Sequence, residues 1–306
     1  MSTLTLRNGL NQLLSQLEAL PPLPSNTSRL LSLDHRDPAC WDEATKIVST
    51  DPALASEVVK MANSALYPGT DPVVTLDDAL MRVGIREVCG ALALSWMERV
   101  FRPPSSVNGD AARRTLVDIW VANLLCALVA RELSRTHSAL DLMPQQAYTH
   151  ALLHHVGRLV MVAFFPKEMD QLTHEWPHPL LVLPGREEEV FGFSHELAGR
   201  MLANHWEFPP ALTQVIAAHH LPPERRLAFP AEVHRMIDLV NLGDCIADTL
   251  RDVTEFDDEA EARVRSELDE SFLKELRDRL ALDPDTVIAC LPEILTELAR
   301  LRSAVG

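Results

Sequence analysis

The sequence is poor in cysteine motifs and in long apolar runs. Its five cysteines, at positions 40, 89, 126, 245 and 290, lie far apart and form no Cys-x-x-Cys pair. This spacing indicates neither a disulfide framework nor a zinc knuckle. Apolar runs such as 159–165 are too short to span a bilayer, and residues 1–7 lack the apolar core of a signal peptide. We therefore expect a cytoplasmic protein.

Basic residues are also scarce. The chain has 28 Lys and Arg against 44 Asp and Glu, which gives a formal net charge of −16 at pH 7. A surface of this sign repels phosphate backbones and anionic lipid head groups. We therefore expect neither nucleic acid nor a membrane among its partners.

Sheet signals and glycine-rich loops are missing as well. No segment shows sustained alternation of apolar and polar residues with β-branched enrichment, and the 306 residues include only 11 glycines. What the chain does have is apolar residues at helical spacing, for example the leucines within residues 3–20, and an apolar fraction of 47% that can fill a core. The sequence predicts an all-α fold.

Local signals place the starts of several helices. Ser25 or Asn26 and then Asp42 are suitable N-caps, Asp51-Pro52 combines a cap with proline in the first turn, and Thr75 with an acidic residue three positions later forms a capping box. These signals predict helices that run to about residue 33, over 44–48, over 52–62 and over 76–83. A further long helix is predicted over 116–133.

The apolar segment 147–165 contains three histidines and is the best candidate for chemistry. If the segment is one helix, His150 and His154 share a face and His155 is rotated from His154 by about 100°. Two imidazoles on one face could bind a metal. The alternative is that these histidines are core residues whose ring nitrogens are hydrogen-bonded to neighbours.

Several motifs in order resemble the HDOD family, the output-type relatives of the HD metal phosphohydrolases. The N-terminal motifs are Leu-Pro-Pro-Leu-Pro at 20–24, Asp-Pro-Ala-Leu at 51–54, Met-Ala-Asn-Ser-Ala at 61–65 and Ala-Leu-Met-Arg-Val-Gly at 79–84. Further on come His-His-Val-Gly at 154–157, Ser-His-Glu at 194–196, the 206–210 turn and Ile-Ala-Ala-His-His at 216–220. The resemblance extends over about residues 18–250.

The resemblance implies a compact, multi-helix, HD-domain-like bundle with two lobes. Residues 1–105 would form an N-terminal helical lobe, and residues 111–250 would form an HD-like lobe with a degenerate metal pocket. Residues 251–306 remain as a helical tail. The tail carries two apolar stripes, which we expect to pack against the core because such stripes rarely stay exposed.

In the catalytic HD relatives, a first histidine, a His-Asp pair and a late aspartate hold one or two divalent metals. The resemblance places the pair at His154 and His155, so an imidazole replaces the aspartate. The first ligand would fall near Asn123, where there is no histidine. The late aspartate would be Asp244 or Asp248. A neutral imidazole brings one lone pair and no charge, whereas a carboxylate can bridge two cations.

The remaining candidates are histidines with one aspartate. We take as pocket candidates His150, His154, His155, His195 and His219, and as metal-ligand candidates His154, His155, His195, His219 and Asp244. His219 and His220 are adjacent, and on a helix both could not easily face one metal. His195 could instead serve only at the start of a helix, after Ser194. We expect no cofactor; the alternative is Zn or Fe at a partial histidine site.

The favoured interpretation is a non-catalytic bacterial regulatory module that binds a signalling protein partner or a small ligand. The alternative is a metal-dependent phosphohydrolase that acts on a nucleotide or a cyclic dinucleotide. A third possibility is a scaffold whose acidic surface and leucine-rich tail bind a basic partner. For the fold we single out Pro21–Pro24 and Asn63, whose polar side chain at an apolar helix end needs a partner.

Overall fold

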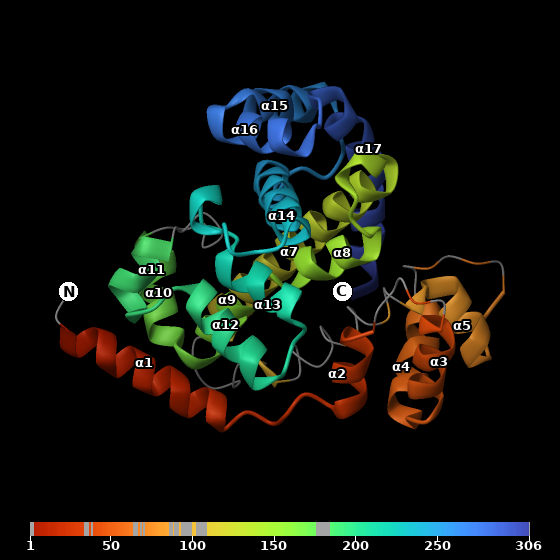
Figure 1. The fold of residues 1–306 in the computed structure, drawn as a ribbon, viewed down its shortest axis with the longest axis horizontal. Helices are drawn as coiled ribbons and strands as arrows, with labels where there is room; N and C mark the ends of the chain where they lie inside the picture. The colour runs from red at the N-terminus through yellow and green to blue at the C-terminus, as the bar shows by residue number, and fades with distance from the viewer. Residues whose placement is uncertain are drawn as a thin grey trace.

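The computed structural model describes residues 3–305, except for 34–36, 38, 64–66, 68, 70, 86–87, 89–91, 93–99, 102–108 and 176–183. Every regular element in these described ranges is an α-helix or a short 3₁₀ helix. The predicted all-α class is therefore confirmed (Figure 1).

The described residues of the N-terminal part include the helices α1 (Thr3–Glu18), α2 (Ser25–Leu31), α3 (Cys40–Ser49), α4 (Pro52–Ala62) and α5 (Leu76–Val83). Two predicted caps are confirmed. Asp51 Oδ1 accepts a hydrogen bond from the Leu54 amide at 3.2 Å, and Thr75 Oγ1 accepts one from the Asp78 amide at 3.2 Å.

The other two predicted caps are wrong. Helix α2 begins at Ser25 itself and ends at Leu31, and its N-cap position is Pro24, which has no capping side chain. Helix α3 begins at Cys40, so Asp42 lies inside its first turn. An acidic residue there still interacts favourably with the positive end of the helix dipole.

Outside 176–183, the middle of the chain forms the short 3₁₀ helices η1 (Ser138–Leu140) and η3 (Pro223–Arg225) and the α-helices α7 (Gly109–Thr136), α8 (Pro144–Leu153), α9 (Val156–Phe164), α10 (Pro166–Glu175), α11 (Pro184–Phe191), α12 (His195–His205), α13 (Pro210–Ala218) and α14 (Ala231–Thr249). The long helix predicted over 116–133 is confirmed within α7. The segment 147–165 is not one continuous helix, because a turn at His154 and His155 divides it into α8 and α9.

The described buried apolar residues form two clusters. The smaller lies among α2–α5 and includes Leu30, Ile47 and Leu80. Asn63, just after α4, ties this part together: its amide nitrogen donates to the Val73 carbonyl and its oxygen accepts from the Val73 amide, both at 2.7 Å. The partner expected for Asn63 is therefore the backbone of Val73.

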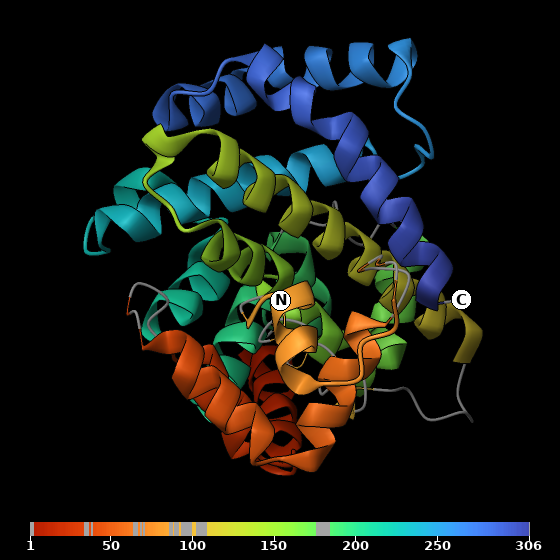
Figure 2. The same cartoon turned by 90° about the vertical axis from the view of Figure 1, so that its right-hand side faces the viewer.

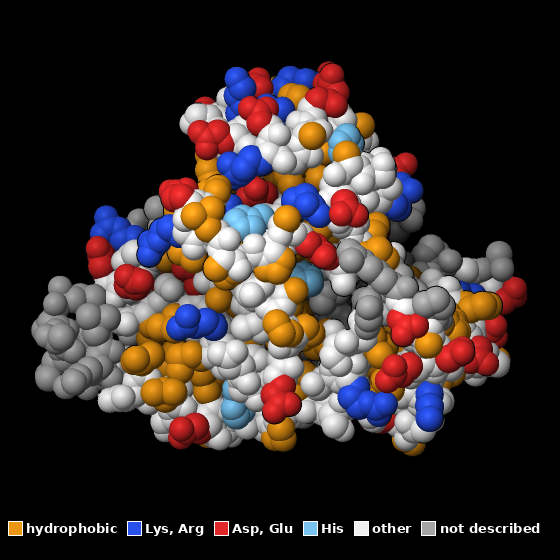
Figure 3. Space-filling model, in the orientation of Figure 1, with side chains coloured by type: hydrophobic (Ala, Val, Ile, Leu, Met, Phe, Trp, Pro, Cys, Tyr) orange, Lys and Arg blue, Asp and Glu red, His pale blue; other side chains and the backbone are white. Residues whose placement is uncertain are grey.

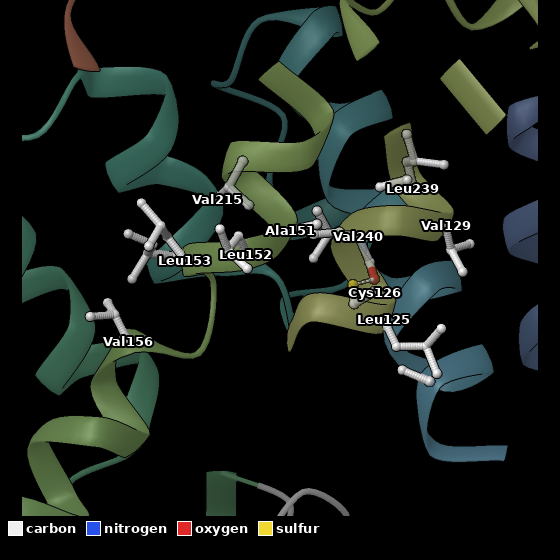
Figure 4. Packing of buried hydrophobic residues seen from close by; sticks show 14 of the residues in the cluster. Leu125, Cys126, Val129, Ala151, Leu152, Leu153, Val156, Val215, Leu239 and Val240 are labelled. Carbon is white, nitrogen blue, oxygen red and sulfur yellow. Dashed lines mark hydrogen bonds between the residues drawn. The ribbon is translucent and has the colours of Figure 1, made fainter. Parts of the chain in front are cut away.

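The larger cluster is built around α7, which packs against α8, α14 and α17. Figure 4 shows side chains of α7, α8, α9, α13 and α14 in this core, with Cys126 on α7 next to Val240 on α14. The Cys126 thiol donates to the Val240 carbonyl oxygen at 3.4 Å. This core holds in place the ends of the helices that carry the histidines.

The tail consists of α15 (Asp258–Asp269), α16 (Ser271–Leu280) and α17 (Pro284–Val305). Its apolar stripes are buried in the larger cluster, as expected, for example at Leu276 and Leu291. Helix α16 packs on α14, and α17 runs along α7 (Figures 1 and 2).

Helices α3–α5, which surround most of the smaller cluster, lie at one side of the molecule, apart from α9–α13 (Figure 1). Helix α1 nevertheless packs on α11 and α12, with Leu13 and Leu17 in the larger cluster. The indole nitrogen of Trp206 donates to the Pro21 carbonyl at 3.1 Å. The division into lobes 1–105 and 111–250 with a tail 251–306 stays a proposal.

Among the described helices, none is both long enough and apolar enough to cross a membrane. On the face drawn in Figure 3, acidic and basic side chains are interspersed over the helices.

Candidate metal centre

The site begins at the turn between α8 and α9, where His154 and His155 are both buried. Two residues later, Gly157 lies against α12 so closely that a Cβ there would overlap the carbonyl oxygen of His195. The absence of a side chain at Gly157 therefore allows the start of α12 to approach the turn. This close approach explains the glycine of the His-His-Val-Gly motif in physical terms.

The start of α12 brings the next histidine. Ser194 is the N-cap, and its hydroxyl accepts from the Leu197 amide at 3.4 Å. His195 follows as the first helical residue and is completely buried. The predicted position of His195 in a first turn is confirmed, and the same geometry points its ring into the site.

Helix α13 ends at Ala218, so that His219 and His220 lie at and beyond its C-terminal end. The Asn241 side chain donates to the His219 carbonyl at 2.7 Å and fixes this end to α14. The rings of these two adjacent residues nevertheless lie next to each other, with centroids 4.3 Å apart. The expectation that His219 and His220 cannot both face one metal is wrong.

Four imidazoles converge. A nitrogen of His155, His195, His219 and His220 lies within 4.8 Å of a nitrogen of each of the others. The Nε2 atoms of His195 and His219 are 3.0 Å apart. Ring centroids are separated by 5.1 Å for His155 and His195 and by 4.3 Å for His219 and His220. We call these four residues the imidazole cluster.

In three of the rings, Nδ1 is directed away from the centre toward an oxygen atom. His195 Nδ1 lies 2.6 Å from Glu187 Oε2, His219 Nδ1 lies 3.0 Å from the Ile216 carbonyl, and His155 Nδ1 lies 3.2 Å from Asn123 Oδ1. A carbonyl or carboxylate oxygen requires a donor, so Nδ1 carries the hydrogen in each neutral ring. The lone pair of each ring is then on Nε2.

The Nε2 atoms of His155 and His220 are buried and have no hydrogen-bond partner among the described residues. Buried polar atoms are nearly always hydrogen-bonded, and an exception needs a physical explanation. Each of these two rings has a nitrogen within 4.8 Å of a nitrogen of His195 and of His219. The four rings together present unused lone pairs to one small volume.

A buried ion-pair network supports His195 from behind. Glu187 Oε2 also accepts from the His195 amide at 2.7 Å, while Glu187 Oε1 lies 3.3 Å from Arg158 Nε. Both Glu187 and Arg158 are only 1% exposed. The network fixes the orientation of the His195 ring.

Burial determines the protonation of the cluster. It lowers the pKa of His155, His195 and His219 well below the ordinary value of 6.5, and it lowers the pKa of His220 to about 4. Neighbouring imidazoles and Arg158 act in the same direction. Burial raises the pKa of Glu187, although the Arg158 charge opposes this shift. The imidazoles are therefore neutral at pH 7, which is the form that binds metals.

A second group lies next to the first and consists of Cys126, His154 and Asp244, whose ligating atoms are within 4.8 Å of one another. His154 Nδ1 donates to the Ala151 carbonyl at 2.6 Å, and its Nε2 is 3.5 Å from Asp244 Oδ1. Burial alone would raise the pKa of Asp244, but His154, Arg158 and His220 together outweigh burial and hold that pKa below its usual value. Of the two predicted late aspartates, Asp244 is the one at the site.

Most of the predicted residues meet here, with one exception. His154, His155, His195, His219 and Asp244 fall into the two groups, whereas His150 does not. The Nδ1 atom of His150 donates to the Gln146 carbonyl at 2.7 Å. His150 is thus held by the backbone of its own helix and lies outside both groups, although His154 directly follows the same helix.

Sequence reasoning missed Glu187, Arg158 and Cys126. Arg158 carried a usable signal, because an arginine inside an apolar helix needs a buried acidic partner. Glu187 stands in the run Glu187–Glu189, which looks like a solvated face, and nothing local sets it apart. Cys126 looked like an ordinary buried thiol, and burial does raise its pKa well above the ordinary value.

A set of neutral imidazole nitrogens suits borderline metals such as Zn²⁺ and Fe²⁺. Mg²⁺ and Ca²⁺ prefer several oxygen ligands, and only Asp244 supplies a carboxylate in the two groups. The residues present therefore fit a transition metal better than a hard cation.

Known proteins share this fold. A 22% identical structure of an HDOD domain protein of unknown function from Geobacter sulfurreducens superposes with a TM-score of 0.69, covering 96% of each chain. A Shewanella amazonensis protein, named for a suspected phosphohydrolase activity, is 20% identical with a TM-score of 0.67 over 96% of this chain and 98% of its own. A Marinobacter aquaeolei protein, named for a suspected role in signal transduction, is 19% identical with a TM-score of 0.67 over 98% of this chain and 66% of its own.

Sequence comparison adds one relative and a family. An uncharacterized protein of Treponema pallidum is 24% identical over 211 residues, which are 68% of this chain but only 39% of that protein. This chain thus spans well under two thirds of that relative's length. The sequence profile of the HDOD domain matches residues 20–222, which is more than half of the chain. The order of the proline, asparagine, glycine and histidine motifs and the family profile agree, and the chain belongs to the HDOD family.

Proposed function

We propose that this chain is a non-catalytic regulatory module of bacterial signal transduction, which acts by binding a protein partner or a small ligand. The observation that carries the proposal is the composition of the buried site. Its two groups contain five imidazoles, one thiol and a single carboxylate, that of Asp244. A centre with this composition is better suited to binding a metal or stabilising the fold than to activating a water molecule.

Two positions support this interpretation. Where the HD enzymes have the aspartate of the His-Asp pair, this chain has His155, and near the position of their first histidine it has Asn123. These two side chains bind each other, since His155 Nδ1 lies 3.2 Å from Asn123 Oδ1. Neither supplies the bridging carboxylate that brings two cations together for attack on a phosphoester.

One observation favours the alternative, a metal-dependent phosphohydrolase that acts on a nucleotide or a cyclic dinucleotide. His154 and Asp244 keep the residue types of the HD enzymes at those two positions, and the Asp244 side chain is 21% exposed. A partly exposed aspartate beside a histidine could serve an ion that is open to solvent.

A turnover assay distinguishes the regulatory module from the phosphohydrolase. The protein is incubated with nucleoside triphosphates and cyclic dinucleotides in the presence of Mg²⁺, Mn²⁺, Fe²⁺ or Zn²⁺, and products are resolved by chromatography. We expect no product above the rate of a heat-denatured sample. Hydrolysis that is lost in His154→Ala, in a protein that still unfolds cooperatively, would overturn the proposal in favour of the enzyme.

The scaffold alternative has less support. It required the leucine-rich tail to dock a basic partner, but the apolar stripes of α16 and α17 are buried within the chain. Phe272 is the one large apolar side chain described as exposed in the tail, at 55%. We therefore place partner binding elsewhere than on these stripes.

A further inference from the structure

We propose that His155, His195, His219 and His220 together coordinate one borderline transition-metal ion, of the Zn²⁺ or Fe²⁺ class, in a closed four-imidazole centre. The sequence favoured no cofactor, and the geometry points to the alternative. This inference deepens the non-catalytic role proposed above and rests on that proposed function. The link between the two is that a closed centre leaves no coordination position for a reacting water.

The spacing of the nitrogens fits this ion. A tetrahedral site with Zn–N bonds of about 2.0–2.1 Å places neighbouring ligand nitrogens about 3.3 Å apart. His195 Nε2 and His219 Nε2 are 3.0 Å apart, and the nitrogens of all four rings are within 4.8 Å of one another. Bringing separations of up to 4.8 Å to this value requires each ring nitrogen to move by less than about 1 Å.

The facing nitrogens also need a cation. His195 donates its Nδ1 hydrogen to Glu187, and His219 donates its Nδ1 hydrogen to the Ile216 carbonyl. With these hydrogens committed, two lone pairs point at each other across 3.0 Å without a hydrogen between them. That contact is repulsive on its own, and a metal ion between the two atoms makes it attractive.

An independent observation comes from the other two rings. The Nε2 atoms of His155 and His220 are buried without a hydrogen-bond partner among the described residues. A neutral Nε2 lone pair accepts either a hydrogen or a metal. One ion accounts for all four nitrogens at once, whereas hydrogen bonds within the cluster can pair only two.

Glu187 acts as a positioning residue for this centre. A metal-bound histidine commonly donates its second ring N–H to a carboxylate, which fixes the tautomer and raises the basicity of the ligand. Glu187 makes this contact with His195 at 2.6 Å, and Arg158 holds the other carboxylate oxygen at 3.3 Å. The second group, Cys126 with His154 and Asp244, stays outside the shell.

The first experiment measures metal content. Tag-free protein, purified without added metal, is analysed for elements and then titrated with Zn²⁺ and Co²⁺. We expect about one ion per chain and at least a tenfold loss of affinity in His195→Gln/His219→Gln. The control is His205→Gln, an exposed residue on the same helix, which should keep the wild-type affinity. No ion as purified and none taken up on titration would overturn the proposal, as would equal affinity in the double variant.

A second variant covers the case in which the double variant does not fold. Glu187→Gln keeps the size of the side chain and leaves all four ligands in place. We expect metal affinity to fall by 10- to 100-fold, the usual effect of losing such a carboxylate. The visible spectrum of the Co²⁺ form should show the intense bands of a tetrahedral site and should shift in the variant. A weak spectrum typical of six-coordinate Co²⁺ would overturn the closed centre.

The outcomes also separate this inference from the proposed function. A tetrahedral ion without turnover supports both. Turnover together with a tetrahedral Co²⁺ spectrum in the same protein would overturn the regulatory role and leave the coordination intact, because catalysis would then occur at His154 and Asp244. Absence of turnover with no metal uptake would overturn this inference alone.

Discussion

Gly157 lies against the backbone of His195 so closely that a Cβ at position 157 would overlap the His195 carbonyl oxygen. The contact sets the separation of α9 and α12 and thereby the separation of the histidines at their N-terminal ends. On α12, a Cβ at Gly199 would meet the end of the Ile216 side chain, Cγ2, at 2.6 Å, and the Gly157 backbone nitrogen less closely, at 3.3 Å. A side chain at position 157 would thus collide with backbone, whereas the nearest atom to a side chain at position 199 is the end of another side chain.

We predict that Gly157→Ala destabilises the protein by about 3 kcal/mol or more, because a clash with backbone forces whole helices apart. Gly199→Ala should cost about 1 kcal/mol, since the Ile216 side chain can move. Urea unfolding of both variants provides the comparison. Equal losses would show that the approach of α9 to α12 does not depend on Gly157.

A second prediction concerns Asp238 on α14, which accepts hydrogen bonds from two arginines. Arg226 Nη2 lies 2.7 Å from Asp238 Oδ1, and Arg279 Nε lies 2.8 Å from Asp238 Oδ2. Arg226 is 1% exposed. Asp238→Ala should lower the free energy of unfolding by about 3–5 kcal/mol, because it leaves a buried charge without its partner.

The control for Asp238 is Glu261→Ala. Glu261 pairs with Arg265 at 3.1 Å, and both side chains are more than 40% exposed. Exposed ion pairs contribute about 0–1 kcal/mol to the free energy of unfolding. If the two variants unfold at the same urea concentration, the buried pair is not a structural requirement.

A third prediction concerns Asn63 and its two hydrogen bonds to Val73. Asn63→Ala removes both and should destabilise the part around the smaller apolar cluster by about 1–2 kcal/mol. Amide hydrogen exchange should accelerate in α4 and α5 and stay unchanged in α7 and α14, which belong to the other cluster. The control is Ser49→Ala, which removes a hydrogen bond at an exposed helix end. Uniform acceleration over the chain would contradict the separation of the two cores.

A fourth prediction concerns pH. Burial lowers the pKa of His150 to about 4, against 6.5 when unfolded. Between these values the unfolded chain binds more protons, so His150 makes stability fall as the pH falls from 6.5 toward 4. We predict that wild type loses more stability than His150→Asn between pH 7 and pH 5, by about 2 kcal/mol at most. Urea unfolding curves of both proteins at both pH values test this prediction. Equal losses of stability in wild type and His150→Asn would contradict it.

Features that depend only on residues close together in the sequence were predicted well. Asp51 and Thr75 cap α4 and α5 because a cap needs only a side chain and the amides two or three residues later. The burial of the tail stripes followed from their helical spacing. The family motifs and the all-α class also came from the chain alone.

The turn at His154 and His155 could not be predicted, because the apolar pattern runs through it without interruption. The turn is recognisable only in the folded chain, where α12 packs against Gly157 in the first turn of α9. The same limit applies to His219 and His220, whose common direction depends on where α13 stops. Glu187 became recognisable only when folding placed it beside His195.

The hydrogen bond from Trp206 to Pro21 joins residues 185 positions apart, and α1 packs on helices from the same distant region. During synthesis, Leu13 and Leu17 therefore leave the ribosome long before the surface that covers them exists. At about 5–20 residues per second, they wait on the order of ten seconds or more. For that interval the nascent chain carries an exposed apolar helix, which makes its first segment a natural substrate for a chaperone.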